Sequence, residues 1–231
     1  MLGAGLSNHA LAGNFTITPV RIYMTPKDRA TAVTVTNDGD AELVMQAELF
    51  LWKQGPDGKD ELTPTDEVFL SPPIIKLAPK SRQVVRLARV GTARPTQQLT
   101  YRMIVREIPE ARKPTQNVEV QVALAFNMPV FITPPEAKPK LDCTVARVAA
   151  NAIKATCENS GNAHTHLVSL LLNGSNGDTL AKDEVGGYIL SGIKRSFELK
   201  RKDGKIPGGA GLLVVSFADG SNRSYDFSIV E

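Results

Sequence analysis

The stretch NVEVQVALAFNMPVFITP, residues 117–134, decides the fold of the first half of the chain. Eight apolar residues occupy every second position within it: Val118, Val120, Val122, Leu124, Phe126, Met128, Val130 and Ile132. Alternate side chains of a β-strand point to the same side, so this pattern predicts one long strand with an apolar face. Strands average about five or six residues, and a long apolar strand promotes aggregation unless it is covered. Either the strand is buried within its own domain, or part of it is held ready for a partner.

The rest of the chain consists of short β-branched runs separated by turn sequences, with almost no helical periodicity. One example is AVTVT (32–36), which leads into Asn37-Asp38-Gly39, a turn sequence that tolerates positive φ. The proline-rich segment TPPEAKPK (133–140) interrupts this pattern, which then starts again. Strands at this spacing without intervening helices indicate antiparallel sandwiches.

We therefore predict an all-β protein of two immunoglobulin-like β-sandwich domains, residues 13–134 and 139–231, joined by a linker at 135–138. Two sandwiches on a short linker are expected to form a bent pair with a cleft between the domains, a common place for a ligand. Trp52 is expected to cap the core of the first sandwich, and Pro72-Pro73 to form a kink with a cis bond.

Composition excludes several classes of protein. With 231 residues the chain is long enough for two domains, each with its own core. The net charge of +3 does not indicate a nucleic-acid partner. No stretch approaches the roughly 20 apolar residues of a membrane span, so we expect a protein that is not embedded in a membrane.

Residues 1–12, MLGAGLSNHALA, are expected to lie outside the fold. Ala10-Leu11-Ala12 fits the A-x-A pattern of a signal-peptidase site, although a positive n-region and a long apolar core are both missing. We interpret the segment as a leader or signal-peptide remnant, with a flexible leader as the alternative.

The two cysteines, Cys143 and Cys157, lie in neighbouring predicted strands that are joined by a short turn. If the hairpin is symmetric about Ala150, the two cysteines face each other at roughly 4.5–5.5 Å between Cα atoms, within disulfide range. The alternative is a pair of buried free thiols. A disulfide would indicate an exported protein, in agreement with the A-x-A pattern.

Enzyme and metal sites are not expected. His164 and His166 are two residues apart on a predicted strand, but no third ligand lies at a suitable spacing, so an exposed strand pair is the favoured interpretation. The chain has no G-x-S-x-G, no P-loop and no dinucleotide fingerprint. The glycine-rich run GGAG (208–211) precedes a strand and not a helix, which argues against a phosphate site. We therefore predict no catalysis, no metal and no cofactor.

Several stretches resemble the periplasmic chaperones of chaperone–usher pilus assembly. They are VRIYM (20–24), VTVTNDGD (33–40), FLSPPIIKLAPKSRQVVRL (69–87), YRMIVREIP (101–109), PVFITPP (129–135), ENSGNAHTHL (158–167) and GYILSGIKRSFEL (187–199). The resemblance implies a periplasmic protein that binds pilus or fimbrial subunits by lending them a strand, called donor-strand complementation, and delivers them to an outer-membrane usher. The alternative is an exported two-domain immunoglobulin-like adhesion or scaffold module.

The resemblance also implies roles for individual residues. The donor positions fall on Val118, Val120, Val122, Leu124 and Phe126, whereas Met128–Ile132 is expected to belong to the domain's own core. One of the family's two basic residues for the subunit's C-terminal carboxylate falls on Arg21, which suits a guanidinium. The other position, usually a lysine, is Pro129 here, a departure that resembles the archaic or alternative branch. Arg102 is the first candidate to replace that lysine and Arg106 the second, and a solvated sheet residue is the alternative for each anchor. Free protein is expected to self-associate if its donor strand needs cover.

Overall fold

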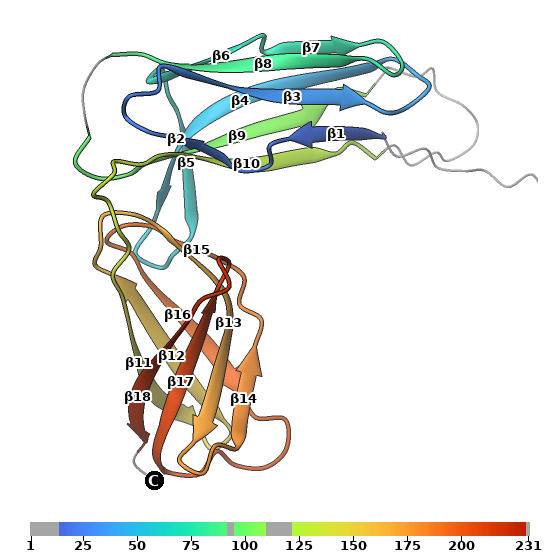
Figure 1. Cartoon of the computed structure of the whole chain (residues 1–231). Helices are drawn as coiled ribbons and strands as arrows, with labels where there is room; N and C mark the ends of the chain where they lie inside the picture. The colour runs from blue at the N-terminus through green and yellow to red at the C-terminus, as the bar shows by residue number, and fades with distance from the viewer. Residues whose placement is uncertain (1–13, 92–94, 110–121, 230–231) are drawn as a thin grey trace, which may run out of the picture. The chain divides into compact units, whose positions relative to one another are not determined.

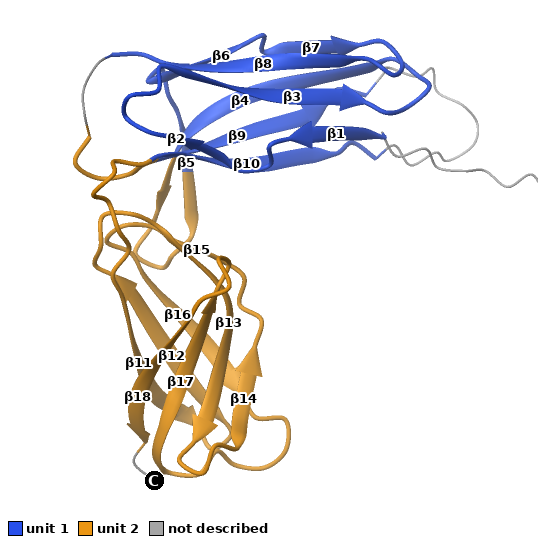
Figure 2. Ribbon diagram, in the orientation of Figure 1, with its two compact units in different colours: residues 1–51, 62–93, 100–132 blue, residues 52–61, 94–99, 133–231 orange. Residues whose placement is uncertain are grey.

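The computed structural model describes residues 14–91, 95–109 and 122–229 (Figure 1). All regular secondary structure within these ranges is β-strand. The chain divides into two compact units (Figure 2). Unit 1 comprises described residues within Met1–Leu51, Leu62–Ala93 and Thr100–Ile132, and unit 2 those within Trp52–Glu61, Arg94–Leu99 and Thr133–Glu231. The prediction of an all-β chain is confirmed. The described part also lacks any helix with the length and hydropathy needed to cross a membrane.

Unit 1 is built from two sheets. The first sheet has the strand order β1 (Phe15–Thr18), β3 (Ala30–Asn37), β8 (Arg82–Arg89) and β6 (Val68–Ser71). The second has the order β2 (Ile22–Met24), β10 (Ala125–Ile132), β9 (Leu99–Glu107), β4 (Leu43–Gln54) and β5 (Asp60–Pro64), with β7 (Ile74–Leu77) also paired to β4. Buried apolar side chains from both sheets, among them Val33, Val85, Met45, Met103 and Val130, form the core.

In unit 1, a cis peptide bond lies at two of the places where the chain passes from the first sheet to the second. These are Thr18–Pro19, between β1 and β2, and Ser71–Pro72, between β6 and β7. The first passage leaves β1 on one sheet and only the three-residue β2 on the other, next to β10.

Strand β4 contributes to both units, and this corrects the expected place of Trp52. Residues up to Leu51 belong to unit 1, whereas Trp52 and Gln54 belong to unit 2. The Trp52 ring packs edge-to-face on Tyr188, with ring centroids 5.3 Å apart, and the Gln54 amide bonds to the backbone of Tyr188 and Leu190. The prediction that Trp52 caps the first core was wrong because the strand continues past that core.

Unit 2 is also a pair of sheets. One has the order β11 (Leu141–Ala149), β12 (Ala152–Asn159) and β16 (Lys194–Lys200). The other has the order β14 (Thr179–Asp183), β13 (Thr165–Gly174), β17 (Gly209–Phe217) and β18 (Asn222–Ile229), with β15 (Gly187–Ile189) also paired to β13. Their inner faces meet in a core that includes Ile153, Leu170, Leu172, Leu199 and Leu213.

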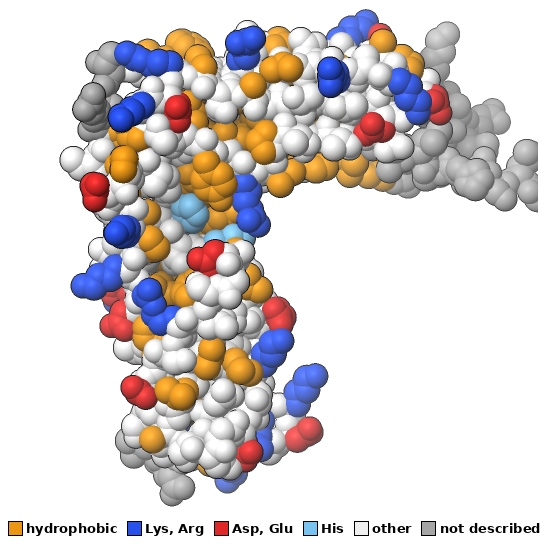
Figure 3. Space-filling model, viewed as in Figure 1, with side chains coloured by type: hydrophobic (Ala, Val, Ile, Leu, Met, Phe, Trp, Pro, Cys, Tyr) orange, Lys and Arg blue, Asp and Glu red, His pale blue; other side chains and the backbone are white. Residues whose placement is uncertain are grey.

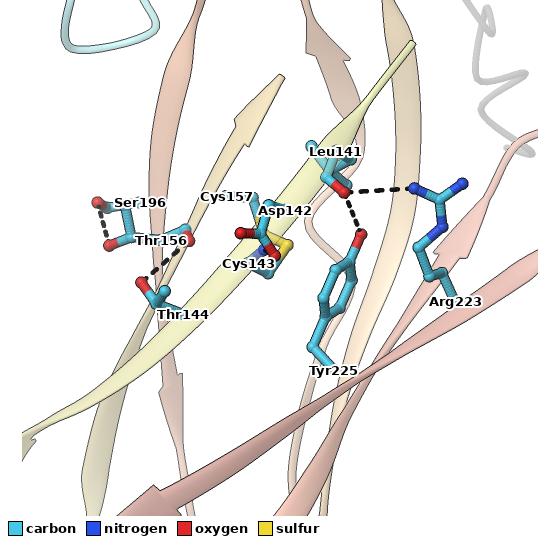
Figure 4. Close-up of a disulfide and its surroundings, with 9 residues drawn as sticks. All are labelled: Leu141, Asp142, Cys143, Thr144, Thr156, Cys157, Ser196, Arg223 and Tyr225. Carbon is cyan, nitrogen blue, oxygen red and sulfur yellow. Dashed lines mark hydrogen bonds between the residues drawn. A yellow bond between two sulfur atoms is a disulfide. The ribbon is translucent and has the colours of Figure 1, made fainter. Parts of the chain in front are cut away.

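The β11–β12 hairpin carries the disulfide between Cys143 and Cys157 (Figure 4). The two residues are direct partners in the ladder, with Cα atoms 4.1 Å apart, as the symmetric hairpin predicted. Both are buried, and the alternative of two free thiols is wrong for this structure. The Tyr225 hydroxyl and the Arg223 guanidinium of β18 both donate to the Leu141 carbonyl, which ties the start of β11 to the second sheet.

Candidate functional site

The apolar residues at even positions of β10 and the segment before it form a continuous row that runs from the core of unit 1 out to solvent. Ile132 and Val130 are fully buried, and Met128 is 2% exposed. Phe126 and Leu124 are half-buried, and Val122 is 57% exposed. We call Val122, Leu124, Phe126, Met128, Val130 and Ile132 the apolar row. Val118 and Val120, the first two expected donor residues, lie outside the described residues.

The cover over the apolar row ends at the edge of the first sheet. Strand β1 is the edge strand of that sheet, and its Phe15 packs edge-to-face on Phe126 with ring centroids 5.1 Å apart. Leu124 and Val122 lie beyond this contact along the chain. In Figure 3 hydrophobic side chains line the side of unit 1 along which Figure 1 draws β1 and β10. The alternation therefore belongs to the core at one end and to the surface at the other.

The backbone of β10 also has an open side. Strand β9 pairs along one side of β10, and on the other side β2 pairs only with Val130–Ile132. Within the described ranges, no strand is hydrogen-bonded to Ala125–Pro129 on the side away from β9. We call this side of Ala125–Pro129 the open edge. An unpaired row of N–H and C=O groups is a template for pairing with another chain.

Strand register brings Arg21 and Arg102 to the two sides of Pro129. The Glu107 N–H donates to the Leu124 carbonyl at 2.9 Å, so the end of β9 meets the start of β10 and the two strands are antiparallel. In a ladder without a bulge, moving five residues along each strand brings Arg102 opposite Pro129. On the other side, the parallel pair Val130–Ile22 places Arg21, one residue earlier, beside Pro129.

The side chains of these three residues point away from the core of the second sheet, because their neighbours Ile22, Tyr101 and Val130 face it, and Pro129 is itself buried. Adjacent strands are about 4.8 Å apart, so the backbones at Arg21 and Arg102 are separated by about 10 Å. Two long guanidinium side chains at that separation can reach one anion between them. The sequence named both arginines, but only the strand register brings them together.

The environments of the arginines differ. Arg21 is exposed, and among the residues that the structure describes no acceptor bonds to its guanidinium. Arg102 is half-buried and pairs in the ladder with Phe50 of β4. Arg106, the second candidate to replace the lysine, forms an ion pair with Glu48 at 2.7 Å. Arg106 lies four residues beyond Arg102 along β9, so of the two arginines Arg102 is the one nearer to Pro129.

An aromatic pair that the sequence analysis did not single out lies next to this site. Tyr23 is 60% exposed and stacks on the buried Phe131, with ring centroids 5.6 Å apart. Phe131 and Tyr23 are ladder partners on the parallel β2–β10 pair. The period of two from Arg21 to Tyr23 puts both on one face, and this spacing was the available clue.

Tyr101, the neighbour of Arg102, points the opposite way. Its ring is in the core of unit 1 and its hydroxyl donates to Glu67 at 2.6 Å. Burial, together with the Glu67 carboxylate, raises the pKa of Tyr101. Tyr101 is therefore a structural residue and not part of the outer face.

The two histidines belong to an aromatic cluster in unit 2. His166 stacks on Tyr188 with centroids 4.1 Å apart, and His164 meets the same ring edge-on at 5.3 Å. The His164 ring nitrogen Nδ1 also lies 2.8 Å from the Gln98 side-chain oxygen. Both rings are half-buried, so the interpretation as an exposed pair was wrong. The described residues contain no group of three or more side chains suited to a metal ion.

Comparison with protein families gives one match. The model of the pili and flagellar-assembly chaperones, PapD N-terminal domain, matches residues 14–138. This range includes Arg21, Arg102, Pro129 and the apolar row. No curated protein matches the sequence.

Solved structures of similar fold cover almost the whole chain. The chaperone CsuC of Acinetobacter baumannii, in a pre-assembly complex with the tip adhesion subunit CsuE of archaic Csu pili, is 21% identical with a TM-score of 0.68 and covers 94% of this chain and 100% of its own. The Escherichia coli chaperone DraB is 20% identical with a TM-score of 0.58, covering 94% and 97%. The Salmonella enterica chaperone SafB, in complex with the pilin SafA, is 13% identical with a TM-score of 0.61, covering 95% and 98%. At these identities the matches establish the two-domain fold.

Proposed function

The chain belongs to the family of pili and flagellar-assembly chaperones, whose model matches more than half of its residues, and we propose that it captures pilus subunits in the periplasm by donor-strand complementation. The observation that carries this proposal is the apolar row, which leaves the core of unit 1 beside the open edge of β10. A partner lacking one strand of its own sandwich needs both features together. The edge supplies backbone hydrogen bonds, and the row supplies side chains for the partner's groove.

The apolar row contributes to binding through burial. Val122, Leu124 and Phe126 are the described donor residues, and Val118 and Val120 extend the same alternation in the sequence. Burying one such side chain fully stabilises by roughly 1.5–3 kcal/mol, less for those already half-buried. Association then costs several kcal/mol in lost freedom of the two partners. Several donor side chains are therefore needed together.

The arginines orient the partner. Arg21 and Arg102, on either side of Pro129, bind the C-terminal carboxylate of the captured subunit. A guanidinium can hold a carboxylate through two parallel hydrogen bonds, which fixes direction as well as position. Arg102 thus takes the role that a lysine at position 129 has in other family members.

Delivery to an outer-membrane usher completes the proposed cycle. The captured subunit is released when the N-terminal strand of the next subunit replaces β10 in its groove. No cofactor or nucleotide takes part, because one set of strand contacts is exchanged for another. The complexes of CsuC with CsuE and of SafB with SafA are complexes of chaperones with pilus subunits, and they support the same role here.

Co-production with pilus subunits from the same genome tests the proposal. The unsubstituted chain is expected to yield a soluble 1:1 complex, and Val122→Asp to lose it, because a carboxylate in an apolar groove carries a high desolvation cost. Val148→Asp is the matched control, since Val148 is 51% exposed on β11 of unit 2. Arg21→Ala is also expected to lose capture. Its control is Arg82→Ala, because Arg82 is an exposed residue of β8. Normal capture by both Val122→Asp and Arg21→Ala would refute the proposed site, provided that circular dichroism finds all variants folded.

A further inference from the structure

Alternation alone does not set the register of a partner strand on β10. Side chains in a strand repeat every two residues, so sliding the partner by two residues returns every apolar side chain to the same face. The apolar row continues without interruption from Val122 to Ile132 and offers no stop of its own. Some other feature must prevent the slide if one subunit is to be held in one position.

The backbone groups that face the open edge can be identified from one hydrogen bond. The Leu124 carbonyl accepts from the Glu107 N–H, so the backbone groups of Leu124 point toward β9. Groups alternate sides along a strand, and those of Phe126 and Met128 therefore also point toward β9. The backbone groups of Ala125, Asn127 and Pro129 point toward the open edge.

Pro129 interrupts that edge. Ala125 and Asn127 each offer an N–H and a carbonyl to a partner, whereas proline has no N–H. Immediately after Pro129, β2 occupies the same side of β10, beginning with the pair Val130–Ile22. The open edge is therefore bounded by a missing donor and then by a strand of the protein's own fold.

We propose that Pro129 is the register stop of the open edge: it ends the ladder with the C-terminal strand of a captured pilus subunit at Asn127. This inference rests on the proposed function and assigns Pro129 a positive role at the position where a lysine is absent. The partner strand runs in the same direction as β2, and its last residue lies beside Asn127, before the point where β2 begins. The chain end then points toward Pro129, where Arg21 and Arg102 lie. The proline sets the distance along β10, and the arginines hold the chain end that arrives there.

Cross-linking between the two strands measures the register. Ala123→Cys provides a thiol just before β10. Ala123 is exposed, and its odd position puts its side chain on the face opposite the apolar row. Single cysteines are placed at each of the last eight residues of a co-produced pilus subunit, and a short thiol-to-thiol cross-linker joins the strands. With Pro129 in place, one subunit position is expected to dominate.

Two variants move the stop in opposite ways. Pro129→Ala restores the missing N–H, and cross-links are expected at positions two residues apart within one preparation. Asn127→Pro removes the donor two residues earlier, and the dominant position is expected to move two residues closer to the subunit's C-terminus. Asn127→Pro disturbs the free protein little, because the N–H it removes faces the open edge. It therefore keeps the test valid if Pro129→Ala fails to fold.

Controls separate the possible outcomes. Asn127→Ala keeps the N–H and should retain the original cross-link, and Pro79→Ala removes an exposed proline away from β10. The original single position in both stop variants would overturn the role of Pro129 while leaving donor-strand capture intact. No cross-link to any subunit position, even with Pro129 in place, would overturn the proposed function and the register stop together.

Discussion

A buried asparagine at the end of a strand holds the same turn in both units: Asn37 is the last residue of β3, and Asn159 is the last residue of β12. Each donates its side-chain amide to the carbonyl four residues later and to two consecutive carbonyls at the end of another strand, while its side-chain oxygen accepts from the N–H two residues later. Asn159 accepts one further bond, from the Lys140 N–H. The two sandwiches therefore share a local design down to individual hydrogen bonds.

The units differ in how their first and last strands are closed. In unit 2, β11 pairs along the length of β12 and is linked to it by the disulfide, and β18 pairs with β17 over eight positions. In unit 1, β1 pairs with β3 over four positions only, and β2 covers three residues of β10. Two units of one design thus differ in closure: unit 2 pairs its first and last strands along their length, and unit 1 leaves one edge unpaired, the edge that the proposed function assigns to a partner.

The largest effect in this comparison is expected from the asparagines. Asn159→Ala leaves three buried carbonyls and two N–H groups without their partner, and we expect it to destabilise unit 2 by about 4 kcal/mol. Asn37→Ala removes one bond fewer and should cost unit 1 about 3 kcal/mol. Urea unfolding followed by the fluorescence of Trp52, the single tryptophan, reports on unit 2, and hydrogen exchange at β3 and β8 reports on unit 1. Changes below about 1 kcal/mol would contradict the shared design.

The disulfide is expected to have the next largest effect, and only in unit 2. Cys143→Ala with Cys157→Ala should lower the stability of unit 2 by about 3 kcal/mol, because the cross-link restricts the unfolded chain across a short loop. The neighbouring ladder pair is the control: Thr144→Ala with Thr156→Ala keeps the cross-link and should cost about 1 kcal/mol or less (Figure 4). Trp52 fluorescence measures both variants. An equal loss of stability in unit 1, or no loss in unit 2, would contradict the conclusion that the disulfide stabilises unit 2 alone.

The smallest effect comes from the outer end of the apolar row. Met128→Ala should cost unit 1 about 2 kcal/mol because it opens a cavity in the core, whereas Val122→Ala should cost less than about 0.5 kcal/mol. Capture of a pilus subunit should respond in the opposite order, more to Val122→Ala than to Met128→Ala, because the proposed function assigns Val122 to the partner. Hydrogen exchange at β9, which pairs with β10, measures the stabilities. A cost at Val122 as large as that at Met128 would mean that the row is covered by its own unit.

The sequence predicted features that depend on local order. Alternation gave the shared face of Val122 to Ile132, and the turn near Ala150 placed Cys143 opposite Cys157. Periodicity did not reveal strands β1 and β2, because four and three residues are too few to produce a recognisable period, and the family resemblance of VRIYM (20–24) was the only indication of β2. The sequence also misplaced Trp52 and the two histidines, whose surroundings come from residues far away in the chain, above all Tyr188.

The sequence by itself determined the strand pattern, the disulfide partners and the family resemblance, because each depends on spacing along one chain. Only the tertiary structure decided where the apolar row leaves the core, which side of β10 is open, and that Arg21 and Arg102 lie on either side of Pro129. These facts depend on the register among β2, β9 and β10, and register is set by strand pairing between segments that are distant in sequence.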